Sequence, residues 1–160
     1  MVKQRLVVVG GSGHALSVGE SAKSCGFIVE GVIDISSDDG GFDSLVSALR
    51  AIDLPSVHLA LGLGANPLRN KVHDAIVRSF PSARFPPIIH PSAWVSPSAL
   101  LSDGVVLLAH AHAGAHASLG FGALLNVGAS IDHESTLGNF ASLGPGARTG
   151  GQVSIGVRTM

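Results

Sequence analysis

The chain has 160 residues, a formal net charge of −1, 46% hydrophobic residues and only 4% aromatic residues. This length allows one domain or two small ones, and the near-neutral charge excludes a basic surface for nucleic acid or anionic membranes. A lone cysteine, Cys25, excludes a disulfide scaffold, and no apolar run approaches the ~18 residues of a membrane span. The apolar run near the N-terminus is too short for a signal peptide, so we expect a cytoplasmic protein.

The first part of the chain reads as a βαβ unit. A buried strand over 6–9 ends in the glycine-rich run 10–14, a helix follows over 15–25, and a second strand covers 27–33. Such a turn lets backbone N–H groups and a helix N-terminus approach a phosphate, although its spacing is not G-x-G-x-x-G. A tight turn without a ligand therefore stays an alternative. Asp34 follows at the distance where a carboxylate could accept from a ribose hydroxyl.

A helix over 42–52 and a third buried strand over 57–61 follow, and Gly64 lies in the next turn. Asn66 is expected to cap a helix that runs to about residue 80. Arg69 falls in the first turn of that helix. It is expected either to lie near enough to the strand ends to meet a phosphate or to be a solvent-exposed charge. A Pro-Pro pair closes this small α/β domain, so the next unit should begin without a flexible linker.

From Ile89 onward Ile, Val or Leu recurs at every sixth position, except at Ala113 and Thr149, with no residue inserted or lost. The series is Ile89, Val95, Leu101, Leu107, Ala113, Leu119, Leu125, Ile131, Leu137, Leu143, Thr149 and Ile155. Neither an α-helix nor a plain strand keeps a six-residue register, whereas a hexapeptide β-helix does. Three hexads make one triangular coil, so residues 18 apart should stack at about 4.8 Å.

Proline, asparagine and glycine recur two and three places after the aliphatic positions, which predicts that these two columns form the corners of the prism. His133 and Glu134 occupy one such corner, so His133 should project outward. By register Gly151 stacks on His133, and His116 stacks beneath Glu134 one coil earlier. We hypothesise that His116 also bonds the Glu134 carboxylate.

His110 and His112 alternate onto one face, but the register supplies no third ligand and no cysteine is nearby. We therefore expect no metal site here.

Four segments together carry a family resemblance: GGSGHA, GLGANPLR, IIHPSAWVSPSA and NVGASIDHESTLG. The chain resembles the bacterial hexapeptide-repeat acyltransferases that acetylate nucleotide-linked amino sugars, which are related to sialic-acid O-acetyltransferases. The resemblance implies a Rossmann-like sugar-nucleotide domain over 1–87 and a left-handed parallel β-helix over 88–160. It also implies a homotrimer through the β-helix with active sites between neighbours. Acetyl-CoA would be the co-substrate, and a UDP-4-amino-4,6-dideoxy sugar the acceptor.

The resemblance also implies a role for each matching residue. His133 would be the general base, Glu134 its orienting partner, and Asn126 would lie beside the reacting groups. The Gly151 N–H would stabilise the thioester oxyanion. The residues around the sugar nucleotide would be Gly11, Ser12, Gly13, His14, Asp34, Gly64, Asn66 and Arg69.

The chemistry of acyl transfer supports these roles independently. An amine must lose a proton as the tetrahedral intermediate forms, and imidazole, with an ordinary pKa near 6.5, suits that task. A carboxylate bonded to the other ring nitrogen fixes the tautomer, and a backbone N–H aimed at the oxyanion supplies roughly 3 kcal/mol.

The sequence departs from the family at three places. Ser142 stands where the family often carries a second histidine near the acetyl group, and Ile35 replaces a common acidic residue. The chain also has fewer coils than the family usually has, so we expect a C-terminally truncated form. The alternatives are O-acetylation of a sugar or sialic acid, a catalytically impaired sugar-nucleotide-binding scaffold, and a nicotinamide-dependent oxidoreductase, which the wrong fingerprint spacing disfavours.

Overall fold

The computed structural model describes residues 3–35 and 41–160, and the chain divides into two compact units, Met1–Pro86 and Pro87–Met160. Each unit has its own core and is described by itself. No helix within the described residues is both long enough and apolar enough to cross a membrane.

The N-terminal unit is built on a parallel sheet of three strands in the order β2-β1-β3. The strands are β1 (Arg5–Gly10), β2 (Ile28–Asp34) and β3 (Val57–Gly62). The central strand β1 is buried from its second residue onward. Parallel strands are joined by crossover helices, so the carboxyl ends of all three strands lie at one edge of the sheet.

Three helices complete this unit: α1 (Ser12–Ser24), α2 (Gly41–Arg50) and α3 (Asn66–Ser79). Helix α1 contacts all three strands, and α2 and α3 contact each other. Helix α1 begins three residues earlier than predicted. Ser12 adopts a φ of 65°, so the chain turns from β1 into the helix with only Gly11 between them.

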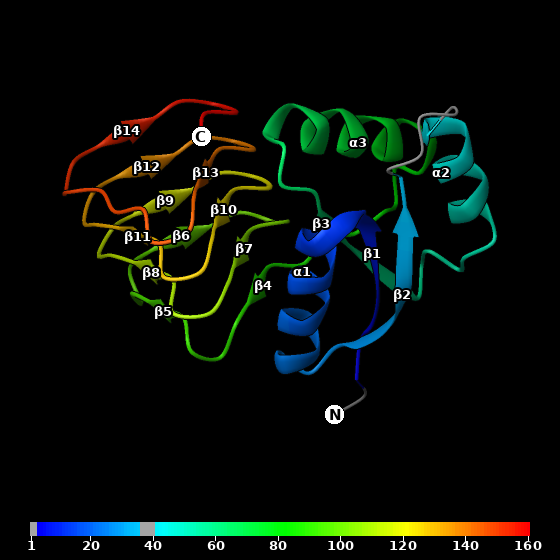
Figure 1. Cartoon of the computed structure of the whole chain (residues 1–160), viewed down its shortest axis with the longest axis horizontal. Helices are drawn as coiled ribbons and strands as arrows, with labels where there is room; N and C mark the ends of the chain where they lie inside the picture. The colour runs from blue at the N-terminus through cyan, green and yellow to red at the C-terminus, as the bar shows by residue number, and fades with distance from the viewer. Residues whose placement is uncertain (1–2, 36–40) are drawn as a thin grey trace. The chain divides into compact units, whose positions relative to one another are not determined.

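The second unit is a parallel β-helix of two-residue strands that form three stacked faces (Figure 1). The first face contains β4 (Ile88–Ile89), β7 (Val106–Leu107), β10 (Leu124–Leu125) and β13 (Ser142–Leu143). The second contains β5 (Trp94–Val95), β8 (His112–Ala113) and β11 (Ser130–Ile131). The third contains β6 (Leu100–Leu101), β9 (Ser118–Leu119), β12 (Thr136–Leu137) and β14 (Ser154–Ile155). Partners in neighbouring coils are 18 residues apart, as the hexad register predicts.

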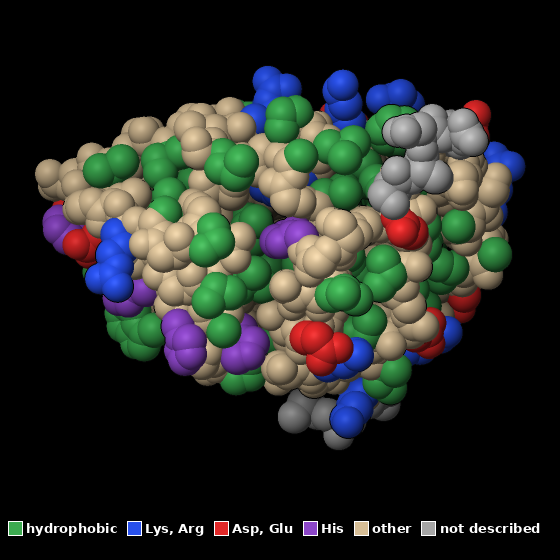
Figure 2. All heavy atoms as spheres, viewed as in Figure 1, with side chains coloured by type: hydrophobic (Ala, Val, Ile, Leu, Met, Phe, Trp, Pro, Cys, Tyr) green, Lys and Arg blue, Asp and Glu red, His purple; other side chains and the backbone are tan. Residues whose placement is uncertain are grey.

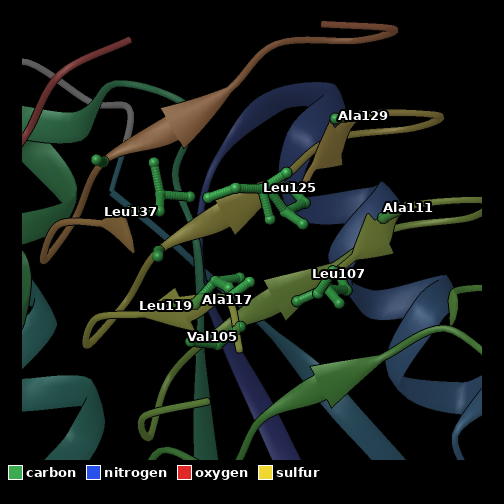
Figure 3. Packing of buried hydrophobic residues seen from close by; sticks show 12 residues of the cluster. Val105, Leu107, Ala111, Ala117, Leu119, Leu125, Ala129 and Leu137 are labelled. Carbon is green, nitrogen blue, oxygen red and sulfur yellow. The ribbon is translucent and has the colours of Figure 1, made fainter. Parts of the chain in front are cut away.

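The interior of the prism is filled by the sixth-position aliphatic residues with small residues beside them (Figure 3). The fully buried members include Leu107, Ala113, Leu119, Leu125, Ile131 and Leu137, together with Ala111, Ala117, Ala123 and Ala129. The members of the outer coils are partly buried. This packing confirms the predicted interior column.

The corners of the prism share a left-handed backbone conformation. Ten residues spaced by six have φ between 53° and 70°: Gly104, His110, His116, Gly122, Gly128, Glu134, Phe140, Gly146, Gln152 and Arg158. They are the residues three places after an inward position, so this corner column was predicted correctly. Glycine adopts such φ values without strain, whereas the six other side chains are held there by the stacked coils.

Candidate active site

His133 and Glu134 lie on the corner that joins the second face to the third. Their side chains are 52% and 54% exposed, so the imidazole projects outward as predicted. Nδ1 of His133 lies 3.1 Å from Oε2 of Glu134. An ionised carboxylate can only accept, so this bond requires the proton on Nδ1 and leaves the lone pair on Nε2. The bond from His133, and then one from Gln152, lower the pKa of the Glu134 carboxyl below its ordinary value.

Gly151 and Gln152 lie directly above this pair, one coil later. A Cβ on Gly151 would lie only 2.3 Å from Nε2 of the His133 ring, so only glycine leaves room for the imidazole. Gln152 Nε2 donates to Glu134 Oε2 at 3.2 Å. The hypothesis that His116 bonds Glu134 is wrong. Within residues 3–35 and 41–160, the carboxylate is bonded from beside and above, and His116 acts on it only through its charge.

A buried hydroxyl holds the two coils together at this corner. Ser135 is fully buried, and its Oγ lies 3.3 Å from the His133 carbonyl and 3.2 Å from the Gly150 carbonyl. The same oxygen accepts from the N–H of Val153 at 3.0 Å. The backbone carrying His133 is therefore fixed to the coil that carries Gly151.

Asn126 and Ser142 lie elsewhere on the prism. Asn126 follows β10 on the first face, where its side chain accepts from the N–H of Val127. Ser142 lies in β13, beside Leu124, and is only 2% exposed. The whole second face separates Asn126 from His133, a distance of roughly 20 Å of extended chain. One chain therefore does not bring Asn126 to the imidazole.

The N-terminal unit has a pocket at the carboxyl ends of its strands, with a volume of about 200 Å³. It is lined by Gly11, Ser12, Ile35, Leu63, Gly64, Ala65 and Leu68. Helices α1 and α3 both begin here, and neither has a side-chain cap on its first N–H groups. The partial positive charge of two helix N-termini favours an anionic group at the same place.

The other predicted residues of this unit are near the pocket without lining it. Asp34 ends β2 beside Gly10, and a Cβ on Gly13 would meet open space. The His14 ring lies near Gly64. Burial, and then the charge of Arg69, lower the pKa of His14 below its ordinary value, which makes this side chain neutral at pH 7.

Arg69 is neither a solvent-exposed charge nor a side chain open to a phosphate. It is 2% exposed, Nη1 donates to the Leu63 carbonyl at 2.8 Å, and Nη2 donates to Asn66 Oδ1 at 2.7 Å. Burial lowers its pKa to about 10, so the group remains a cation at neutral pH. Its bonds fix the turn that leads into α3.

The prediction that Asn66 caps α3 is wrong for the same reason. The cap residue is Ala65, and Asn66 is the first residue of the helix. Its side-chain oxygen accepts from Arg69, so it makes no capping bond.

Histidine side chains also lie close together on the surface of the β-helix (Figure 2). His110 and His112 line an open hollow of about 330 Å³ on the second face, together with Ser130, Asp132 and Arg148. Among residues 3–35 and 41–160, no group of three or more His, Cys, Asp or Glu side chains is arranged to hold a metal ion.

No family model and no curated protein matches this chain in sequence searches. Solved structures do match it. A mutant of GDP-perosamine N-acetyltransferase from Caulobacter crescentus, in complex with CoA and GDP-perosamine, is 32% identical with a TM-score of 0.83. The match covers 98% of this chain and 76% of that one. PerB from the same organism, also with CoA and GDP-perosamine, is 25% identical over 96% of this chain and 92% of that one, with a TM-score of 0.60.

The acetyltransferase domain of PglB from Neisseria gonorrhoeae, in complex with acetyl coenzyme A, has a TM-score of 0.77 at 23% identity. That match covers 97% of this chain and 86% of the domain, and at this identity it supports the fold alone. These matches define the class, that of acyltransferases built on a left-handed parallel β-helix. The chain belongs to the family of bacterial hexapeptide-repeat sugar acetyltransferases.

Sequence reasoning missed one residue of the corner, Gln152. The register places it 18 residues after Glu134, above the carboxylate, as it places His116 below. Both residues are one coil from Glu134, so the spacing predicts a bond to the carboxylate equally well for either. Only the side-chain directions show that Gln152 makes the bond.

Proposed function

We propose that this chain transfers the acetyl group of acetyl-CoA to the amine of a nucleotide-linked amino sugar. The observation that carries the proposal is the His133–Glu134 pair on an exposed corner, with a glycine backbone packed against the ring. The related N-acetyltransferase, which binds CoA and GDP-perosamine, supports the same reaction class.

In the proposed mechanism the amine nitrogen attacks the thioester carbonyl carbon, and a C–N bond forms. Nε2 of His133 takes the proton that the amine loses. Glu134 holds the opposite ring nitrogen in its protonated form and stabilises the imidazolium that results. The C–S bond of the intermediate then breaks, and the proton passes to the departing sulfur.

The Gly151 N–H is the proposed donor to the oxyanion of the tetrahedral intermediate. It belongs to the residue that touches the His133 ring, so base and donor are a few ångströms apart. A preorganised backbone donor of this kind contributes about 3 kcal/mol to transition-state stabilisation.

We propose that residues 1–87 act as a Rossmann-like sugar-nucleotide domain and residues 88–160 as the acyltransferase domain. The pocket at Gly11, Ser12 and Gly64 has two uncapped helix N-termini, which suit the diphosphate. Gly13, His14 and Asp34 would contact the sugar and ribose. Asn66 and Arg69 act indirectly, by shaping the turn beside the pocket.

We also propose that the working form is a homotrimer. Asn126 and His133 lie on opposite edges of the second face, and Trp94, on that face, is 52% exposed. Packing this face towards a threefold axis would bring Asn126 of one chain to His133 of the next. Ser142 lies in β13 on the first face and is only 2% exposed, and its proposed contact with acetyl-CoA rests on the family resemblance.

Thiol release from acetyl-CoA tests the function, measured with UDP- and GDP-linked amino sugars and with their hydroxyl counterparts. Release that requires the amine and falls about 100-fold or more in His133→Ala supports the proposal. His110→Ala, which removes an exposed histidine from another corner, is the matched control and should keep its rate.

Other outcomes assign the alternatives. Release with hydroxyl acceptors only would make the protein an O-acetyltransferase. Nucleotide-sugar binding by calorimetry, without turnover, would make it a binding scaffold. Turnover that persists in His133→Ala would contradict the proposed base.

A further inference from the structure

We propose that Gln152 is a positioning residue for the general base. Its side-chain amide holds the Glu134 carboxylate against Nδ1 of His133, so that the ring is protonated on Nδ1 and carries its lone pair on Nε2. This inference rests on the proposed function and adds to it a residue whose part is to orient the carboxylate.

Two hydrogen bonds meet on one oxygen atom. Oε2 of Glu134 accepts from His133 Nδ1 at 3.1 Å and from Gln152 Nε2 at 3.2 Å. A carboxylate oxygen has two lone pairs and can accept both bonds at once. The Glu134 side chain is 54% exposed, so it is free to adopt other rotamers. Without Gln152, only the bond to the imidazole would offset the loss of this rotamer freedom. The second donor selects the rotamer that already faces the ring.

The backbone of Gln152 is fixed to the residue whose ring it influences. Its N–H donates to the His133 carbonyl at 2.8 Å. Its φ is 57°, in the left-handed conformation of the corner, and its side chain reaches back one coil to Glu134. The buried Ser135 hydroxyl ties the adjacent Gly150 and Val153 to the same turn. The amide is therefore presented from a rigid position.

An uncharged donor suits this task better than a cation. A lysine or arginine beside Glu134 would neutralise the charge that stabilises the imidazolium in the reaction. An amide orients the carboxylate and leaves its negative charge in place. The other charged groups around this pair are Asp132, whose Oδ1 accepts from the His133 N–H, and His116, which influences Glu134 only through its charge.

The tautomer of His133 gives a direct readout of the proposal. A neutral imidazole in water populates both tautomers, whereas the Glu134 bond selects the form protonated on Nδ1. Nitrogen-15 NMR of histidine-labelled protein separates the two forms, and the signals missing from His133→Asn assign the residue. We expect the Nδ1-protonated form to dominate in the wild type and to lose that dominance in Gln152→Met.

The value of kcat should fall when the fraction of the Nδ1-protonated tautomer falls. For Gln152→Met we expect kcat to fall about 3- to 10-fold with KM changed less than about twofold, the size of effect that one hydrogen bond supplies. Gln152→Glu keeps the shape of the side chain but places a second carboxylate against Glu134. Its kcat should fall further at pH 8 than at pH 5.5, where part of that charge is neutralised. Arg158→Met, at the same corner position six residues later, is the control and should change neither readout.

A wild-type tautomer ratio in both Gln152 variants would overturn the proposal, as would unchanged kcat in both. A Gln152→Met protein that fails to fold leaves Gln152→Glu to decide, because the latter retains the size and polarity of glutamine. If the wild type shows no acetyl transfer at all, the proposed function fails while the NMR comparison still decides whether Gln152 orients Glu134.

Discussion

At the corner of the β-helix, His133 and Glu134 are about half exposed, whereas the Arg69 guanidinium beside the N-terminal pocket is buried. The pKa of Glu134 is lowered by hydrogen bonds from His133 and Gln152, and that of Arg69 is lowered by burial. Exposed groups held by a few bonds can be altered with little cost in folding. Buried groups bonded to the backbone cannot, so the two sites should respond differently to substitution.

Between the two sites, the larger effect on catalysis should come from Gly151→Ala at the corner. The new methyl group would occupy the space of the His133 ring and push it out of its position. We expect kcat to fall about 100-fold, because general-base catalysis depends on the placement of the base. The free energy of unfolding should change by less than about 0.5 kcal/mol, since the displaced ring is at the surface. Gly150→Ala, where the added Cβ meets nothing within 4 Å, is the control.

Arg69→Met should produce the opposite pattern, a loss of stability in the N-terminal unit. The substitution leaves the Leu63 carbonyl and Asn66 Oδ1 without the donor that they have in this structure. Chemical denaturation should show a loss of about 2 kcal/mol. Arg78→Met, an exposed position in the last turn of the same helix, should be close to neutral. Equal stability of the two variants would remove the contrast between the sites.

A subunit-mixing experiment tests whether the corner site is completed by a second chain. His133→Ala and Asn126→Ala are each expected to be inactive. When the two are unfolded together and refolded at equal amounts, about a quarter of the sites in a trimer should contain both intact residues. The measurement is the thiol-release rate against each variant refolded alone. No recovery of activity would contradict a site shared between two chains.

The smallest expected effect is the pH dependence of stability. Burial, and then the charge of Arg84, lower the pKa of His58, whose buried Nδ1 has no hydrogen-bond partner among the described residues. Burial also lowers the pKa of His14. A folded pKa below the unfolded value near 6.5 means that the unfolded state binds more protons as the solution is acidified. This contribution to stability is full above pH 6.5 and is lost below it.

Between pH 7.5 and 5.5 we expect the free energy of unfolding to fall by less than about 1 kcal/mol, because both side chains are only partly buried. Urea titrations at the two pH values measure it. His58→Met should reduce the slope, and a slope equal to that of the wild type would exclude a role for His58. The lowered pKa of Glu134 contributes outside this window, at more acidic pH.

The sequence predicted the β-helix closely because a repeat imposes the same requirement on every coil. Leu107, Leu125 and Leu143 had to be inward together, and His133 followed outward from the same register. The direction of a corner side chain is not contained in that register. Gln152 and His116 are each one coil from Glu134, so spacing alone could not decide which of them bonds the carboxylate.

The sequence of the N-terminal unit contains no repeat, so the environment of each side chain had to be predicted separately. The strand and helix patterns predicted the elements to within a few residues. They could not predict that Arg69 turns inward, because a cation in the first turn of a helix is usually solvated. The error about the Asn66 cap follows from that one, since the oxygen expected to cap the helix is bonded to the guanidinium.

The Ser135 hydroxyl and the Gln152 N–H tie the imidazole-bearing turn to the following coil. In a solenoid each coil depends mainly on its neighbours, so one coil can open while the remainder stays folded. Local opening around Gly151 would separate His133 from the following coil without unfolding the protein. Activity should therefore be lost at a lower temperature than the calorimetric transition. The difference between the two temperatures would measure the local stability of this turn.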